Sequence, residues 1–125
     1  MPVRRQGGFS NRYLTRVLAG PLPDFVYAVS DGEGVKVGRT AEHPLERLRD
    51  LQVGNPRVLV LLAWTTTISE RQAHRKLWRH RVRGEWFRPH PALLAELRTW
   101  DWIDERALAA AESGAPVAGL EQPSV

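Results

Sequence analysis

The alternation of apolar and polar residues divides the chain into short strands and amphipathic helices. Phe25–Ser30 and Val35–Arg39 are apolar, β-branched runs, a composition that is typical of strands. Between them stands Asp31-Gly32-Glu33-Gly34, which has the residue types of a tight loop. We predict a β-hairpin over these residues.

The length of the loop decides which side chains share a face of the hairpin. If residues 31–34 form the loop, Val29 lies opposite Lys36 and Tyr27 lies opposite Gly38, which places all four positions on one face. Gly38 then leaves space beside the tyrosine ring. A loop that is one residue longer puts Tyr27 and Lys36 on opposite faces, and Tyr27 is then an ordinary strand aromatic.

The residues after the hairpin have the spacing of a helix. Pro44 suits the first turn of a helix, leucines follow at positions 45, 48 and 51, and Gly54 suits a C-terminal cap with positive φ. We therefore predict a helix over residues 44–52. The apolar run Val58–Trp64 has the length of a strand that is covered on both faces, and we predict that it is the central strand.

The second half of the chain is predicted to contain two helices. Ser69 and Gln72 have the spacing of a capping box, so the first of these helices spans residues 70–80. Glu85-Trp86-Phe87 is a short, mostly apolar segment that follows a glycine. Apolar residues at helical spacing then predict a single helix over residues 91–112.

These elements follow the order β-β-α-β-α-α, which predicts an α+β domain with a small antiparallel or mixed sheet and helices packed on it. We place this domain at residues 24–112. Residues 1–23 are rich in arginine, glycine and proline, and we expect a basic arm with a short helix around Tyr13–Leu18. Residues 113–125 are expected to form a flexible tail.

Composition and charge limit the kinds of function that the protein can have. The chain has 125 residues, which fits one domain, and no cysteine, which excludes a disulfide framework and a thiolate metal site. Its net charge of +4 and pI near 10.3 favour an anionic partner such as nucleic acid. No apolar run is long enough to span a bilayer, and residues 1–8 lack the apolar stretch of a secretory signal, so we expect no membrane association and a cytoplasmic location.

Glu70 lies on the inward stripe of its predicted helix, together with Ala73, His74 and Leu77. An inward carboxylate requires either an arginine or a divalent metal as its partner. In the alternative, Glu70 is a solvated acid in the first turn, where the helix dipole favours negative charge. His74 either reaches the same centre or is a boundary histidine, and without a third ligand the two do not identify a zinc site.

The stretch from Arg71 to Arg83 carries positive charge only. Such a run favours phosphate contacts, and the alternative is a merely soluble surface, although such surfaces ordinarily mix both signs. The expected nucleic-acid-binding residues are Arg71, Arg75, Lys76, Arg79, Arg81 and Arg83, together with Arg39 from the hairpin. Trp78 and Trp86 are expected to be core residues instead of base-stacking platforms.

Arg47 lies at the margin of the leucine stripe on the helix over residues 44–52. From there its guanidinium reaches toward the hairpin face, whereas Arg49 is freer to face solvent. The alternative for Arg47 is a surface salt bridge to Glu46 or Asp50.

Five short motifs follow one another along the chain: Phe25-Val26-Tyr27, Lys36-Val37-Gly38-Arg39-Thr40, Glu46-Arg47-Leu48, Glu70 with His74, and Gly84-Glu85-Trp86-Phe87. Taken in this order they resemble the GIY-YIG nuclease superfamily, and the similarity is greatest to its small phage-type branch. The resemblance covers roughly residues 24–97 and rests on the order of the motifs, because each motif alone is a weak signal.

The resemblance implies a three-stranded antiparallel sheet flanked by helices. It implies that Tyr27 is a general base, that Arg47 stabilises charge on the scissile phosphate, and that Glu70 binds one loosely held Mg²⁺ or Mn²⁺. Phe25 and Lys36 depart from the family pattern, where a glycine and a tyrosine are usual. Lys36 either supports the chemistry by holding a phosphate oxygen, or indicates that the chemistry was lost while DNA binding was kept.

The sequence therefore predicts a monomeric, metal-dependent endonuclease that nicks or hydrolyses DNA and grips its backbone without reading bases. The expected catalytic residues are Tyr27, Lys36, Arg47, Glu70 and His74, with Glu70 as the metal ligand. Two alternatives stay open. One is a catalytically inactive DNA-binding module of the same fold, and the other is a protein-interaction domain whose Trp100, Trp102 and leucine-rich last helix bind a partner.

Overall fold

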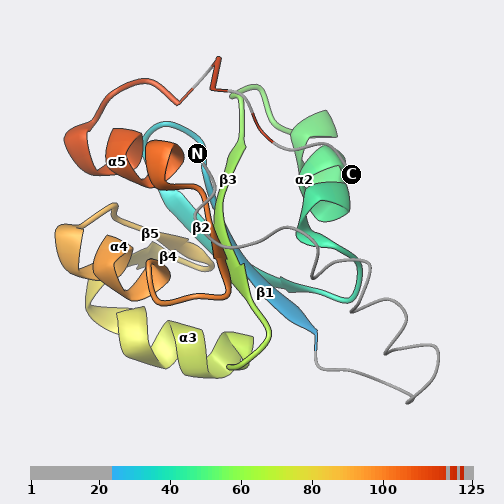
Figure 1. Cartoon of the computed structure of the whole chain (residues 1–125), viewed down its shortest axis with the longest axis vertical. Helices are drawn as coiled ribbons and strands as arrows, with labels where there is room; N and C mark the ends of the chain where they lie inside the picture. Colours follow the sequence, from blue (N-terminus) through green and yellow to red (C-terminus); the bar gives the residue numbers. More distant parts are fainter. Residues whose placement is uncertain (1–23, 118, 121, 123–125) are drawn as a thin grey trace.

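One antiparallel sheet crosses the described part of the chain, with six strands in the order β4-β5-β2-β1-β3-β6 (Figure 1). The structure is a computed structural model that describes residues 24–117, 119, 120 and 122. The arm predicted over residues 1–23, with its short helix around Tyr13–Leu18, lies outside the described residues. The predicted small three-stranded sheet is wrong, because the sheet has six strands.

Three long strands occupy the middle of the sheet: β1 (Phe25–Ser30), β2 (Val35–Thr40) and β3 (Val60–Thr65). The other strands are short: β4 (Arg81–Arg83), β5 (Trp86–Phe87) and β6 (Trp102–Ile103). Strands of two or three residues show no readable alternation, so the sequence pattern does not reveal them. They form because a neighbour supplies their backbone partners: β5 pairs with β2, β4 with β5, and β6 with β3.

The predicted hairpin is confirmed, and of the two loop lengths left open the structure has the shorter one. Tyr27 pairs with Gly38, so residues 31–34 form the loop. Asp31 closes that loop, because its N–H donates to the Gly34 carbonyl at 3.2 Å and its Oδ1 accepts from the Gly34 N–H at 2.7 Å. Aspartate at the start of a turn favours this arrangement.

The helices among the described residues are α2 (Pro44–Val53), α3 (Glu70–Leu77), the 3₁₀ helix η1 (Trp78–His80), α4 (Pro91–Leu97) and α5 (Glu105–Ser113). The capping box of α3 is confirmed: Ser69 Oγ accepts from the Gln72 N–H at 3.1 Å, and Gln72 Oε1 accepts from the Ser69 N–H at 2.8 Å. Gly54 caps α2 with a φ of −96°, so the positive φ expected there is wrong.

The single helix predicted over residues 91–112 is also wrong, because β6 separates α4 from α5. Trp102 pairs with Trp64 at the edge of the sheet. Asp104 then starts α5, because its Oδ1 accepts from the Ala107 N–H at 3.1 Å. Residues of α4, β6 and α5 are buried in the same core, and this shared burial gives the whole stretch an apolar pattern that resembles one helix.

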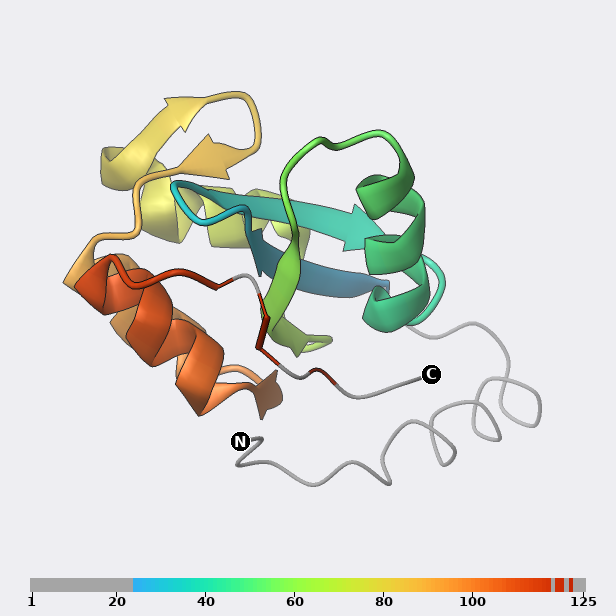
Figure 2. The same cartoon turned by 90° about the horizontal axis from the view of Figure 1, so that it is seen from above.

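Helices cover both faces of the sheet (Figures 1 and 2). The larger core lies under α3, α4 and α5, and the smaller core lies between the sheet and α2. β3 contributes Leu62 to the larger core and Leu61 to the smaller one, so the prediction that this strand is covered on both faces is confirmed. It is not the central strand, because β1 and β2 occupy the middle of the order.

Described residues after α5 lie against the domain. Gly114 ends α5 in the left-handed conformation, with a φ of +76°, and Val117 is buried in the larger core. Gln122 Oε1 accepts from the Leu61 N–H at 2.6 Å, and its Nε2 donates to Asp104 Oδ2 at 2.8 Å. This part of the segment expected as a tail therefore contacts β3 and the start of α5.

Candidate functional site

The second half of β2 has an edge on which several elements converge. Among the described residues, β5 pairs with β2 at Val35 and Lys36, and the Val37 N–H adds one bond to the Glu85 carbonyl at 2.8 Å. Beyond that point α3 approaches the strand, since His74 Nε2 lies 2.9 Å from the Val37 carbonyl oxygen. Side chains from β1, β2, α3 and the β4–β5 turn therefore meet at this edge.

Tyr27 reaches the edge because Gly38 has no side chain. The tyrosine is 2% exposed and pairs with Gly38. A Cβ atom on Gly38 would lie 2.5 Å from Tyr27 Oη and 2.7 Å from its Cζ, so the phenol fills the space over the glycine. The same Cβ would lie 3.1 Å from Glu85 Oε1. The hydroxyl and this carboxylate therefore approach the same point.

Glu85 forms an ion pair with Lys36 beside the tyrosine. Lys36 Nζ lies 2.9 Å from Glu85 Oε1, and the two side chains are 20% and 40% exposed. Gly84 makes the turn that presents Glu85, with a φ of +57° that favours glycine. Lys36 thus lies on the same face as Tyr27, as predicted for the shorter loop.

Glu70 on α3 and Glu85 in the β4–β5 turn share a side-chain hydrogen bond. Burial is the largest cause that raises the pKa of Glu70 above its ordinary value, and the hydrogen bond and charge of Glu85 raise it further. Burial acts in the same direction on Glu85, but its hydrogen bonds with Lys36 and Glu70 outweigh burial, so the pKa of Glu85 lies below its ordinary value. As pH rises, Glu85 therefore loses its proton before Glu70 does.

Arg47 on α2 extends toward Tyr27 from the other side. A side-chain hydrogen bond with Tyr27 is the largest cause that raises the pKa of Arg47, and the charges of Asp50 and Glu42 contribute less. Its buried Nε has no hydrogen-bond partner within the described residues. This buried donor is therefore left unsatisfied, while the guanidinium bonds the Tyr27 hydroxyl.

His74 lies next to the carboxylates, but the fold holds its ring. Nε2 bonds the Val37 carbonyl, and the ring packs edge-on against Phe87 with 5.1 Å between centroids. Of the predicted catalytic residues, His74 is therefore brought to the site while its Nε2 engages the backbone.

A divalent metal ion fits the carboxylate pair. The described residues include no group of three or more His, Cys, Asp or Glu side chains suited to a metal. Glu70 and Glu85 nevertheless form an all-oxygen donor set, and Mg²⁺ prefers oxygen ligands, keeps several waters and uses few protein ligands. The ion would take the place of the shared proton.

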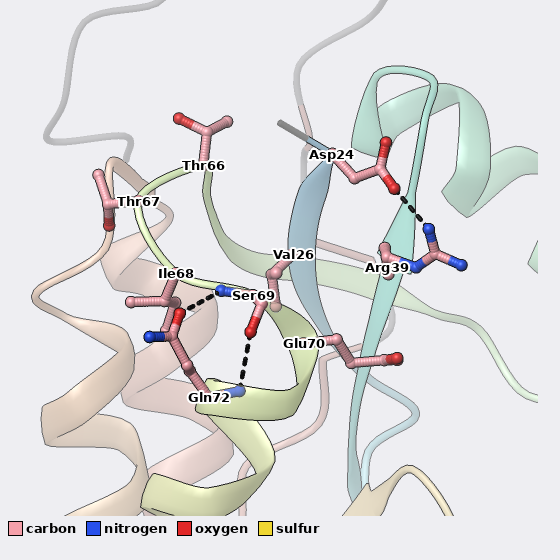
Figure 3. Close-up of a pocket in the computed structure, with 9 residues that line it drawn as sticks. All are labelled: Asp24, Val26, Arg39, Thr66, Thr67, Ile68, Ser69, Glu70 and Gln72. Carbon is pink, nitrogen blue, oxygen red and sulfur yellow. Dashed lines mark hydrogen bonds and ion pairs between the residues drawn. The ribbon is translucent and has the colours of Figure 1, made fainter. Parts of the chain in front are cut away.

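A cavity of about 310 Å³ lies beside Glu70 (Figure 3). Its walls come from the beginning of β1, the end of β2, the β3–α3 loop and the first turn of α3. They are formed by Asp24, Val26, Arg39, Thr66, Thr67, Ile68, Ser69, Glu70 and Gln72. Figure 3 shows Glu70 extending from α3 toward β2, where Arg39 is paired with Asp24. Of the site residues Tyr27, Lys36, Arg47, Glu70 and Glu85, only Glu70 lines this cavity.

The predicted nucleic-acid-binding residues of α3, η1 and β4 are exposed, namely Arg71, Arg75, Lys76, Arg79, Arg81 and Arg83. We call them the basic surface. Lys76 is paired with Glu96 at 3.5 Å. Arg39 is also exposed, but it lies on the cavity side. Trp78 is 63% exposed on the basic surface, so the prediction that it belongs to the core is wrong, whereas Trp86 is half-buried.

Glu85 is the site residue to which the sequence-based prediction gave no role. It is the only acid between Glu70 and Glu96, and a single acid in a basic stretch, directly after a turn glycine, is a usable signal. Its position against Lys36 depends on the β4–β5 turn, and strands this short leave no pattern in the sequence.

The structure also bears on the expected protein-interaction surface and on membrane association. Trp100 and Trp102 are each 2% exposed, so they offer no surface to a protein partner. Among the described residues, every helix falls short of the length and apolar content that a bilayer span requires.

A family model described as the T5orf172 domain matches residues 24–105. Comparisons with curated proteins and with solved structures gave no match. The resemblance to the GIY-YIG nuclease superfamily is wrong, because the family that matches is a different one. Five short motifs in order were too weak a signal to assign the family.

We predict that Gly38→Ala lowers the free energy of unfolding by about 1–3 kcal/mol, the usual cost of overpacking a core. The added methyl group would overlap the buried Tyr27 phenol. Urea unfolding followed by tryptophan fluorescence measures this change. Gly54→Ala is the control, because no atom lies within 4 Å of its Cβ position. Equal losses in the two variants would contradict the packing described here.

The two carboxylates should respond to pH with opposite signs. Because the pKa of Glu70 is raised above the ordinary 4.5, its ionisation destabilises the fold as pH rises through the raised pKa. Glu70→Gln should therefore gain stability relative to wild type above that pH, by up to about 1 kcal/mol, with no gain below 4.5.

Glu85→Gln should behave in the opposite way. The pKa of Glu85 is lowered, so its charge stabilises the fold above the ordinary pKa, and that stability is lost as pH falls through the lowered pKa. This variant should be less stable than wild type at neutral pH. Urea unfolding of all three proteins between pH 3 and pH 8 measures both effects, and slopes of the same sign would contradict this order of proton loss.

Proposed function

We propose that this chain, which belongs to the T5orf172 domain family over residues 24–105, hydrolyses phosphodiester bonds of DNA with the help of one divalent metal ion. One observation carries the proposal: Tyr27, Arg47 and Glu70 approach the edge of β2 from three different elements. Their residue types supply a base, a clamp for phosphate charge and a metal ligand, which together suffice for this reaction.

Glu70 and Glu85 would hold the ion, Mg²⁺ or Mn²⁺. When bound, such an ion polarises a phosphoryl oxygen and neutralises its charge. Lys36 is a positioning residue in this proposal, because its ammonium lies 2.9 Å from Glu85 Oε1 and keeps that carboxylate ionised and fixed beside Tyr27.

Tyr27 is the proposed general base. In the proposed step its hydroxyl proton passes to Glu85, close to the same point, while its oxygen accepts a proton from the attacking water. The bond from phosphorus to the leaving sugar oxygen breaks, and that oxygen takes a proton from solvent. The guanidinium of Arg47, which bonds Tyr27, is proposed to hold a non-bridging oxygen of the phosphate. Its charge then offsets the negative charge that grows in the transition state. His74 positions α3 against β2 through the Val37 carbonyl.

The basic surface supports binding of the DNA backbone. Its arginines are exposed, and contacts from such side chains to phosphates give affinity without sequence information. Arg39 is proposed to contact a phosphate near the cavity. A monomeric state and a cytoplasmic location are part of the proposal, since a single chain carries every residue of the site and its substrate is DNA.

A second candidate function is DNA binding without hydrolysis. The ion pair between Lys36 and Glu85 favours it, because an ammonium 2.9 Å from the carboxylate occupies a position that a metal ion would use.

A plasmid-nicking assay with Mg²⁺ tests the reaction. Wild type should convert supercoiled DNA to nicked circles, and Tyr27→Phe, Arg47→Ala and Glu70→Gln should each lose about 100-fold or more in rate. Arg49→Ala is the matched control for Arg47→Ala, because Arg49 is an exposed arginine on the same helix. Equal rates in all these variants, or no nicking by wild type with retained DNA binding, would favour the second candidate.

Metal binding should depend on pH through Glu70. Below its raised pKa the ion must displace the proton that resides on Glu70, so affinity for Mn²⁺ should rise about tenfold per pH unit and level off above that pKa. Titration with Mn²⁺ followed by electron paramagnetic resonance measures this without substrate. Glu70→Gln should bind weakly at every pH. A flat profile for wild type between pH 4.5 and pH 8 would exclude Glu70 as the ligand.

A further inference from the structure

Trp78 is an aromatic side chain on the surface with no packing role in the site described above. It is the first residue of η1, directly after α3, and it is 63% exposed. Val82 on β4, the strand that follows, is 60% exposed. Leu77, the preceding residue, is buried. Two neighbouring apolar side chains therefore point in different directions, Leu77 into the core and Trp78 to solvent. Large exposed apolar side chains are informative because folding ordinarily buries them.

Trp78 stands in a stretch of sequence whose charged residues are all positive. From Arg71 to Arg83 the sequence has no acid. The guanidinium of Arg79 lies over the Trp78 ring, with its Cζ 5.5 Å from the ring centroid. This contact holds the indole in place by a cation–π interaction, and the rest of the ring remains open to solvent. A fixed aromatic ring among cations suits a partner with both flat apolar rings and negative charge.

A nucleic-acid strand has both properties, because its bases stack on aromatic side chains while arginines contact its phosphates. A second copy of the chain fits poorly, since two such surfaces facing each other would repel. A membrane surface fits less well than DNA, because the exposed apolar area consists of Trp78 and Val82 alone on this part of the described chain, whereas membrane-binding helices present a long apolar face.

The distance along the helix relates Trp78 to the carboxylate pair. Eight residues separate it from Glu70 in sequence, which corresponds to about 12 Å along a helix at about 1.5 Å per residue. A stacked DNA strand rises about 3.4 Å per nucleotide, so this distance corresponds to about three to four nucleotides of a stacked strand and to fewer of an unstacked one.

We propose that Trp78 stacks on an unpaired base of the bound DNA, within about three to four nucleotides of the scissile phosphate. The preferred substrate is then DNA with a single-stranded segment next to the scissile bond, such as a flap or a gap. The inference rests on the proposed function for the position of the cut, while the stacking itself requires binding alone. Pairing within a duplex would hide the base from the indole.

Binding in EDTA tests the stacking apart from hydrolysis. Fluorescence anisotropy would compare a labelled single-stranded 20-mer of thymidine with a 20-base-pair duplex, for wild type, Trp78→Phe and Trp78→Ala. We expect Trp78→Ala to weaken single-strand binding about tenfold or more and duplex binding less than about twofold. Trp78→Phe should retain most of the affinity. The dependence on salt should not change, because no charge is removed.

Val82→Ala is the matched control, since it shortens the other exposed apolar side chain on this surface and should leave both affinities unchanged. Circular dichroism shows whether the variants fold. Equal effects of Trp78→Ala on both DNA forms, or none on either, would overturn the proposal. Two further results would overturn it if single-strand binding did not depend on Trp78. One is a dimer that forms without DNA and requires Trp78, and the other is Trp78-dependent binding to vesicles of phosphatidylserine and phosphatidylcholine.

The position of the base is tested with 2-aminopurine placed at successive positions of a flap substrate in EDTA. Quenching by wild type, but not by Trp78→Ala, should be greatest at one position within about three to four nucleotides of the junction. Quenching without a preferred position would overturn the placement. If Trp78-dependent single-strand binding is present but Mg²⁺ produces no nicking, the hydrolysis is wrong and the stacking is retained. If nicking is present but single-strand binding does not depend on Trp78, the stacking is wrong and the hydrolysis is retained.

Discussion

The contact between the Tyr27 ring and the backbone at Gly38 is the constraint on which the site depends. A tyrosine in a central strand ordinarily covers the side chain opposite to it in the next strand. Here that position is a glycine, so the ring lies over the neighbouring strand and brings its hydroxyl to the edge of β2. The helix on one face supplies Arg47 and the helix on the other face supplies Glu70, and this edge is where contributions from both faces meet.

The carboxylate pair lowers the stability of the fold at neutral pH. Glu70 and Glu85 come from separate elements, and the fold brings them close enough to share a proton. In a site that served stability alone, a cationic side chain would lie between the two carboxylates. The single lysine nearby pairs with Glu85, and Glu70 is left with a raised pKa. Unfavourable electrostatics of this kind in a partly buried place are typical of functional sites.

Several site residues were predictable because local rules decide their positions. Loop composition located the hairpin but left two loop lengths open, and the structure has the shorter one, which sets Tyr27 opposite Gly38. The capping box fixed the start of α3, so that Glu70 stands in its first turn. Arg47 follows from the leucine stripe of α2. The role of Glu85 was not predictable, since it depends on a turn between two very short strands, and neither was the exposure of Trp78, because an aromatic residue beside a buried leucine is ordinarily buried as well.

The sequence by itself determined the hairpin, the starts of α2, α3 and α4, the strand that is covered on both faces and the positive charge from Arg71 to Arg83, because these depend on neighbours within a few residues along the chain. Only the tertiary structure decided the other features: the six-stranded sheet, the break between α4 and α5, and the meeting of Glu70 with Glu85. Each of these requires hydrogen bonds or charges from segments far apart in sequence. A strand of two residues exists only where a partner strand is already in place, and no local pattern records that partner.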